Sequence, residues 1–263
     1  MKNRSYRIPG LVTLVLLGIT ATAYTSSAQF GQENAARKTQ TINLKLDHFW
    51  CYIISQEQTT DPNTAATLTD QFQTATVSIG TPLQFCNPVQ KTIGTDVTPI
   101  VDVNDHLTMY NLQNPAPLPT AQTLTATNQF GSTQLTVDKA TTIMVPTQKL
   151  LENLRFPTRL DHFLCYPVTA ASIAQTVSLI DQFQTEDVTL EKPVLFCNPV
   201  QKTILGQKTS RIQNPSAHLL CYNIRLPQST TPRQVPMKNQ IEADTFTVTT
   251  TQMVCAPSTK TLP

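Results

Sequence analysis

The feature that most constrains the fold is an internal duplication. Residues 46–52, LDHFWCY, return as LDHFLCY at 160–166. Residues 85–93, FCNPVQKTI, return letter for letter at 196–204. Self-similarity on this scale is the signature of repeat architectures, and strings this long do not recur by chance. The chain therefore contains two copies of one unit.

Each copy contains a fainter second echo of the same pattern. The opening string returns as DHLTMY at 105–110 and as AHLLCY at 217–222, and the closing string as MVPTQK at 144–149 and CAPSTK at 255–260. Between the two ends lies a short turn motif, Asp or Asn followed by Gln and Phe or Ile, at 70–72, 128–130, 181–183 and 239–241. The sequence thus divides into four quarter-repeats of about 45 to 50 residues, arranged as two pairs.

The quarter-repeats indicate how the six cysteines pair, which a sequence alone normally does not reveal. Three quarters have a Cys at both ends, and the second quarter has Met109 and Met144 at both corresponding positions. Because both partners are missing together, each pair is expected to be one disulfide inside one quarter. The predicted bonds are Cys51–Cys86, Cys165–Cys197 and Cys221–Cys255.

A zinc site is the alternative interpretation of the cysteines. Zinc sites commonly use a C-x-x-C pair, and the chain has none. We therefore expect no metal and no cofactor at these residues. Each predicted disulfide closes a loop that should contribute roughly 3 to 4 kcal/mol in the chain-entropy account.

The first 28 residues have the layout of a secretory signal peptide. Lys2, Arg4 and Arg7 precede an apolar run from Leu11 to Ile19, and small residues lead up to Ala28. The apolar run is about half of the roughly 20 residues that a spanning helix needs, which argues against an uncleaved anchor. We expect cleavage after Ala28, no stable membrane span afterwards, and a secreted protein in the periplasm, at the cell surface or outside the cell, where disulfides persist.

The charge balance argues against nucleic acid as a partner. The signal peptide removes three of the 19 basic residues and none of the 17 acidic ones, so 16 bases and 17 acids remain, a net charge of −1. Such a chain has no basic field to attract phosphates.

The sequence predicts an all-β fold. In the opening string, Phe49 and Cys51 would share one face of a strand, with His48, Trp50 and Tyr52 on the other. The 19 prolines oppose long helices. One quarter is too small to bury a core, whereas two match a small domain. We therefore predict two tandem small β-sandwich or barrel domains, each built from two quarter-repeats, at 42–151 and 156–263, after a polar leader at 29–41.

Three sets of residues suggest sites. The four His residues occupy one repeat position and could bind metal or exchange protons, but four equivalent positions favour a structural role. The Lys residues at 91, 149, 202 and 260 could form an anion-binding row, although a solvated turn position is favoured. Trp50 could stack on a sugar, although a partly buried aromatic is favoured. The His residues of the repeat position are His48, His106, His162 and His218.

The paired signatures H-[FL]-x-C-Y and C-x-P-x-x-K resemble a family of uncharacterised repeat domains in secreted bacterial proteins. The resemblance covers nearly the whole chain after the signal peptide, and the family has no known activity, so it implies no functional residues. No G-x-S-x-G, H-E-x-x-H, G-x-G-x-x-G or P-loop string occurs, and no catalytic residue is predicted.

We expect an exported, non-catalytic β-repeat protein that serves binding, adhesion or structure, with a surface or extracellular protein or glycan as its partner. Two alternatives stay open. One is a hydrolase or other enzyme with its site at the inter-domain joint. The other is metal binding through the His row.

Overall fold

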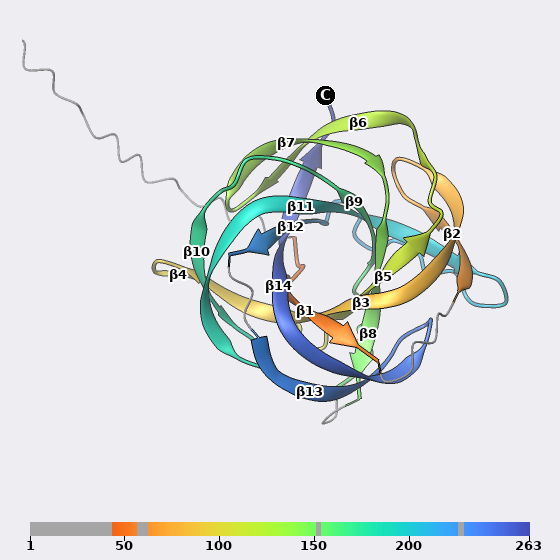
Figure 1. The fold of residues 1–263 in the computed structure, drawn as a ribbon. Helices are drawn as coiled ribbons and strands as arrows, with labels where there is room; N and C mark the ends of the chain where they lie inside the picture. The colour runs from red at the N-terminus through yellow and green to blue at the C-terminus, as the bar shows by residue number, and fades with distance from the viewer. Residues whose placement is uncertain (1–43, 57–62, 151–153, 226–228) are drawn as a thin grey trace, which may run out of the picture. The chain divides into compact units, whose positions relative to one another are not determined.

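The computed structural model describes residues 44–56, 63–150, 154–225 and 229–263, which form fourteen strands (Figure 1). The predicted signal peptide and the whole of the predicted polar leader, 29–41, lie outside these residues. All of the described regular structure is strand, so the all-β prediction is confirmed. No helix in the described part of the chain has the length and apolar character needed to cross a bilayer.

Each quarter-repeat folds into a short strand with the opening motif, an arm strand, and a long strand that ends in the closing motif. In the second quarter the long strand is broken in two. The first copy comprises β1 (His48–Ser55), β2 (Thr64–Thr69), β3 (Thr74–Ile93), β4 (Asp96–Thr98), β5 (His106–Gln113), β6 (Pro117–Asn128), β7 (Gly131–Lys139) and β8 (Thr142–Lys149). The second comprises β9 (His162–Pro167), β10 (Gln175–Ile180), β11 (Thr185–Ile204), β12 (His218–Ile224), β13 (Ser229–Lys238) and β14 (Ala243–Thr261).

Eight of these strands form a closed antiparallel ring. The short strands alternate with the closing halves of the long strands, in the order β1, β3, β5, β8, β9, β11, β12, β14 and back to β1. The ring is thus a small barrel, and Figure 1 shows the long strands curving around its centre. All four short strands run in the same direction, so the four His residues at their starts lie at one end.

The two tandem copies are the two halves of this ring. They meet at two seams, where β8 pairs with β9 and β14 pairs with β1. The predicted domain boundaries, 42–151 and 156–263, fall at the first seam. Because both seams are antiparallel pairings, the copies share one sheet, and the described residues belong to one compact unit.

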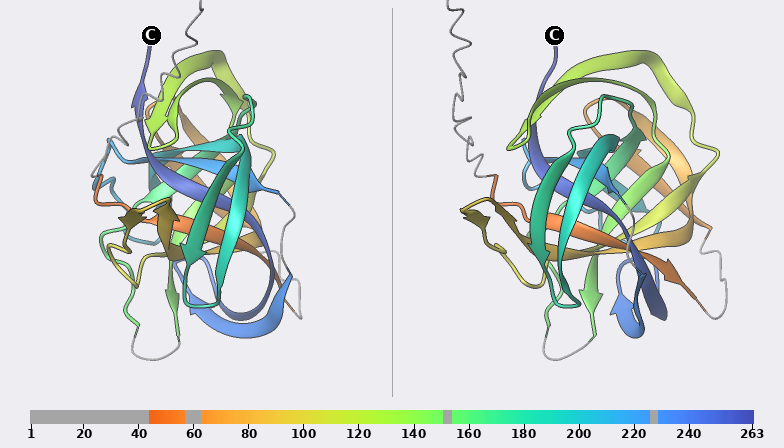
Figure 2. Two further views of the ribbon diagram at one scale, coloured as in Figure 1. Left: turned by 90° about the vertical axis from the view of Figure 1, so that its left-hand side faces the viewer. Right: turned by 60° about the vertical axis from the view of Figure 1, so that its left-hand side comes forward.

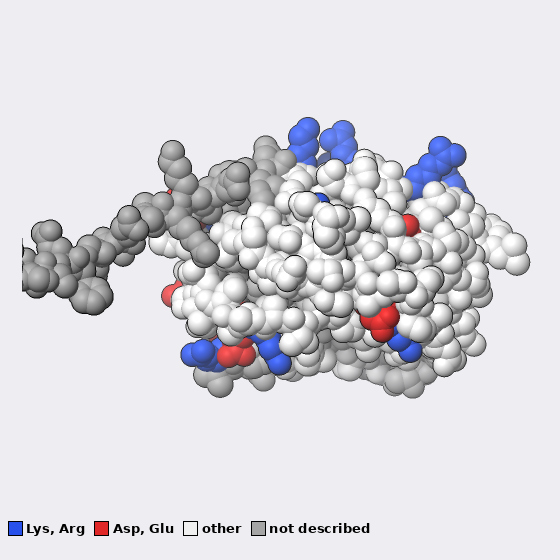
Figure 3. Space-filling view, turned by 90° about the horizontal axis from the view of Figure 1, so that it is seen from above, with Lys and Arg blue, Asp and Glu red and all other residues white. Residues whose placement is uncertain are grey.

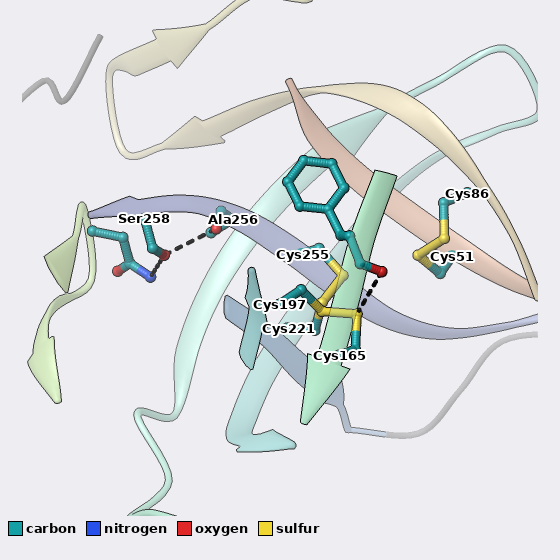
Figure 4. Close-up of a disulfide and its surroundings, with 10 residues drawn as sticks. Cys51, Cys86, Cys165, Cys197, Cys221, Cys255, Ala256 and Ser258 are labelled. Atoms are coloured by element: carbon teal, nitrogen blue, oxygen red, sulfur yellow. Dashed lines mark hydrogen bonds between the residues drawn. A yellow bond between two sulfur atoms is a disulfide. The ribbon is translucent and has the colours of Figure 1, made fainter. Parts of the chain in front are cut away.

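Inside the ring lies a core rich in sulfur. The predicted alternation of the opening motif holds, because Phe49 and Cys51 belong to this inner core whereas Trp50 and Tyr52 belong to an outer one. The three expected intra-quarter disulfides are present, with Cα atoms 3.8 to 4.0 Å apart (Figure 4). The inner core consists of Phe49, Cys51, Cys86, Leu107, Met109, Met144, Leu160, Phe163, Cys165, Cys197, Leu219, Cys221, Met253 and Cys255.

The arms fold back over the outside of the ring (Figure 2). Each arm strand pairs with the opening half of its own long strand, or with β7 in the second quarter. Its far end then pairs with the closing half of the long strand from the opposite quarter, as β10 does with β3 and β2 with β11. Alternation explains why the arms are rich in Thr, since in β2 Ala66 and Leu68 are buried while Thr67 and Thr69, on the other face, are half-buried. The arms thereby bind the two copies together.

Candidate functional site

The four turn motifs sit at the tips of the arms. Asp70 Oδ1 accepts hydrogen bonds from the backbone N–H groups of Phe72 and Gln73, at 2.9 and 3.0 Å. Asn128, Asp181 and Asn239 accept equivalent bonds from the residue two positions on. This local bonding is the reason why Asp and Asn occupy the first position, and the predicted turns are confirmed.

Each tip is fastened to the opposite quarter through a buried Tyr. Tyr52 donates to Asp181 at 2.7 Å, and Tyr166 donates to Asp70 at 2.9 Å. In the other two quarters the Asn amide is the donor. The same contact then joins Asn239 to Tyr110 at 2.7 Å and Asn128 to Tyr222 at 2.9 Å. We call these four contacts the tyrosine latches.

The residues around each latch change together with the turn residue. Where the tip carries Asp, an Asn from the closing motif supplies a second donor, from Asn87 to Asp181 and from Asn198 to Asp70, both at 2.9 Å. Where the tip carries Asn, the closing motif has Val or Ala in place of its own Asn. A hydroxyl of that motif then accepts a hydrogen bond from the tip. Those contacts are Asn239 to Thr147 at 3.3 Å and Asn128 to Ser258 at 3.1 Å. Each tip carboxylate therefore meets two side-chain donors in addition to the backbone N–H groups of its own turn.

The four repeated Lys side chains hold a neighbouring tip. Lys91 donates to Gln129, and Lys202 donates to Gln240 at 2.5 Å. Lys149 donates to Gln182, and Lys260 instead donates to Asn198 at 2.9 Å. Three of the ammonium groups also lie over a Phe of the tip, 4.3 to 5.3 Å from the ring centroid.

The expectation that these Lys residues are solvated turn residues is wrong. Lys91 and Lys202 are only 1 and 2% exposed. Burial lowers the pKa of each of Lys91, Lys202 and Lys260 to about 8. No pattern in the sequence indicates this burial, because the covering tips come from other quarters.

The four His side chains are buried under the same tips. Gln129 hydrogen-bonds His48 Nε2, His106 Nδ1 bonds the backbone oxygen of Asn104 at 2.9 Å, and two His rings stack on Phe at 5.4 and 5.5 Å. Burial, together with the nearby Lys, lowers the pKa to about 3 for His48, His162 and His218 and to about 4 for His106. Near neutral pH all four imidazoles are therefore uncharged.

The structure does not gather the His row into a metal site. Among the described residues, no three His, Cys, Asp or Glu side chains lie where they could hold one ion. Trp50 is fully buried in the outer core, so it cannot serve as an exposed sugar platform. The repeated polar residues are thus occupied in holding the quarters together.

A pocket of about 770 Å³ opens beside the first seam. Phe156, Pro157 and Leu160, from the segment that joins the two copies, form an apolar wall. Another part of the lining comes from the loop that follows β11, with Lys208 and Arg211. Pro146 reaches the pocket from the first copy, and Gln240 reaches it from the last arm tip. The pocket therefore combines unlike residues from both copies.

Hydrogen bonds fix the shape of the loop wall. Lys202 and Ser210 exchange two backbone hydrogen bonds of 3.1 and 2.9 Å. Asp161 accepts from the backbone N–H groups of Gln213 and Asn214 at 2.7 and 2.8 Å. Bonds within the protein thus hold this part of the pocket lining in place.

Sequence reasoning missed this pocket, although a signal was present. The loop after the closing motif differs between the copies more than the motifs do. At 94–105 it carries Asp96, Asp102 and Asp105 and no base, whereas at 205–217 it carries Lys208 and Arg211 and no acid. A reversal of charge within a duplicated unit marks a position where the two copies have diverged.

The repeats of this chain are those of a known family. A family model described as a repeat of unknown function, DUF7450, matches residues 31–141 and 119–257. The chain belongs to this family. No curated protein and no solved structure matches it.

The family model matches this chain twice, in agreement with a repeat, although the bounds of the two matches differ from those of the two copies. Together the two matches span the ring and its arms, and they overlap in 119–141, which includes most of the β6–β7 arm. The resemblance to an uncharacterised repeat family is therefore confirmed. In this DUF7450 protein the repeated residues build the inner disulfides and the outer latches, whereas the pocket is built largely from residues that are not repeated.

Proposed function

We propose that this protein is an exported, non-catalytic module that binds a protein or glycan at the cell surface or outside the cell. Three disulfides within the ring support export, because such bonds persist in oxidising compartments. The predicted signal peptide supports it independently.

The observation that carries this proposal is that the repeated polar residues hold the quarters together. The tyrosine latches and the Lys contacts join quarters that are far apart in sequence. A scaffold of this kind is rigid, and rigid scaffolds present binding residues on the loops that they position. We assign binding to the loops at the end of the ring where the four His residues lie. One of these loops, which follows β11, lines the pocket.

The outer surface favours recognition through neutral groups and a few local charges over attraction by a charge spread across the whole surface. Only 14% of the residues are charged, and most of the face in Figure 3 carries neither acid nor base. Charged groups can therefore act locally where they gather, as they do beside the pocket.

The enzyme alternative is favoured by one observation, the position of the pocket at the joint between the copies. Its chemistry favours binding instead. The low pKa of His162, about 3, makes this imidazole a poor base near neutral pH, and the Ser210 hydroxyl donates to Gln240 at 3.0 Å. No Asp or Glu is among the described residues that line the pocket.

The experiment has two parts. Protein recovered from its natural host should begin at Gln29 and contain no free thiol, as shown by N-terminal sequencing and thiol titration. Purified protein should then be retained by envelope fractions or glycans of that host and release no product from ester, peptide or glycoside substrates. Turnover of any such substrate, or the absence of retention, would reject the binding function.

A further inference from the structure

We propose that the pocket beside the first seam binds an acidic sugar unit, with the anionic group on Lys208 and Arg211. The inference rests on the proposed binding function and deepens it, because it names the site and the chemical class of the ligand.

The first argument is charge. Lys208 and Arg211 line one wall and are exposed, and neither makes a hydrogen bond or an ion pair with a described residue. An ammonium and a guanidinium that line the same pocket, without a carboxylate among the described lining residues, suit a carboxylate, sulfate or phosphate group.

The second argument is the buried charge behind the pocket. The Lys202 ammonium donates to the Gln240 oxygen, and Gln240 itself lines the pocket. Burial lowers the pKa of Lys202 to about 8, and no carboxylate of the described residues offsets that shift. Asp96 and Asp70 do so in part for Lys91 and Lys260. A bound anion would supply the missing negative charge.

The third argument is an unused polar atom. His162 lines the pocket and is 6% exposed, and although Gln240 lies near enough to raise its pKa, Nε2 makes no hydrogen bond of normal geometry with a described residue. A buried polar atom without a partner costs roughly 1 to 3 kcal/mol. A hydroxyl of the ligand would satisfy it.

The remaining lining favours a sugar ring over a bare ion. The Phe156 ring and Pro157 offer an apolar face, as sugar rings require. Ser210 and Gln213 donate to Gln240 and to the Thr158 backbone, so they offer a ligand their hydroxyl and amide oxygens as acceptors. A volume of about 770 Å³ accommodates a sugar unit.

The proposal predicts how three probes bind. Glucuronate, glucose and inorganic sulfate would be titrated into the full chain by calorimetry at low salt. We expect glucuronate to bind at least tenfold more tightly than glucose or sulfate. A further titration of glucuronate with added sodium chloride should show weaker binding, because salt screens the charges.

The deciding variant is K208Q/R211Q, in which both residues are exposed, so that folding is spared. Its matched control is K139Q/K192Q, two exposed Lys residues on β7 and β11. We expect the affinity for glucuronate to fall at least tenfold in K208Q/R211Q and to stay unchanged in the control. The imidazole ¹⁵N resonance of His162 should move on titration, while that of His48 should not.

Several results would overturn the proposal. They are undetectable glucuronate binding by the unmodified chain, equal binding of glucose, equal binding of sulfate, or an unchanged affinity in K208Q/R211Q. If K208Q/R211Q is still retained by envelope fractions as the unmodified chain is, the binding function stands and the pocket is not its site. If the unmodified chain is not retained at all, the binding function itself fails.

Discussion

Met109 and Met144 face each other across β5 and β8 in the same register that each disulfide occupies in its own quarter. The corresponding pairs are Cys51 with Cys86, Cys165 with Cys197 and Cys221 with Cys255. Both Met side chains belong to the inner core. Met suits the position because its flexible thioether fills the space that a disulfide leaves.

This register predicts that M109C/M144C forms a fourth disulfide. The bond would close a loop like those of the other quarters, and we expect roughly 3 kcal/mol of added stability, less if the native bond is strained. Mass spectrometry of the unreduced protein should show the loss of two hydrogens, and chemical unfolding should show the gain. The single variant M109C serves as control, since it should leave one reactive thiol after unfolding. Two free thiols in the double variant would contradict the equivalence of the quarters.

The tyrosine latches predict a difference between Y52F and Y222F. Burial, with Asp181 nearby, raises the pKa of Tyr52, so this hydroxyl stays a donor. Y52F leaves Asp181 with one side-chain donor, from Asn87, and should cost about 1 to 2 kcal/mol. Y222F should cost less, because the neutral amide of Asn128 still reaches Ser258. Denaturant unfolding of both variants measures the two costs, and an equal or reversed order would reject this account.

Local signals in the sequence were enough for part of this fold. The alternation at Phe49, Trp50 and Cys51 indicates which side chains point inward. The turn residues at the arm tips are recognisable because their bonding is local. The second quarter has Met109 and Met144 at both positions where the other quarters have Cys, and this joint replacement indicates how the six cysteines pair.

Contacts between quarters could not be predicted in the same way. Nothing near Tyr52 in the sequence indicates that its partner is Asp181, 129 positions away. The burial of Lys91 likewise depends on a tip that belongs to the next quarter. Gly80 is a further example, since a Cβ there would lie 2.5 Å from Asn111 Oδ1 on the neighbouring strand. These residue identities depend on contacts that form when the ring closes, so the sequence pattern within one quarter cannot predict them.

From the acidic loop at 94–105 in the first copy we predict that D105N stabilises the protein. Asp105 is 7% exposed. Burial, followed by the charges of Asp47 and Asp102, raises the pKa of Asp105 to about 7. The folded state then binds this proton more tightly than the unfolded state does, so stability declines as the pH rises from about 4 to about 7. Ala217 occupies the equivalent position in the last quarter, so the architecture does not need a carboxylate there.

We expect D105N to gain on the order of 2 kcal/mol at pH 8 and almost nothing at pH 4. Urea unfolding at both pH values measures the difference. D138N is the control, because Asp138 is exposed at the edge strand β7 and should show no pH-dependent gain. A gain that is the same at both pH values would show that the Asp105 charge is not responsible.

The two seams predict what residues 156–263 would do alone. In the full chain β9 pairs with β8 and β14 pairs with β1, so removal of the first copy leaves two ring strands without partners. The strands that are lost have equivalents within the segment itself, since β1 corresponds to β9 and β8 to β14. Exposed edges of this kind recruit another strand.

A second copy of 156–263 can therefore complete the ring with two-fold symmetry, by pairing β9 of each copy with β14 of the other. The latches fit as well, because Asp181 of one copy would meet Tyr166 and Asn198 of the other, in place of Tyr52 and Asn87. We expect a homodimer with both disulfides formed, whose unfolding midpoint rises with protein concentration. Light scattering coupled to size exclusion measures the mass, with the full chain as the single-copy reference. A folded monomer would show that one half can close its own sheet, and the proposed boundary at 156 would then delimit an independent domain.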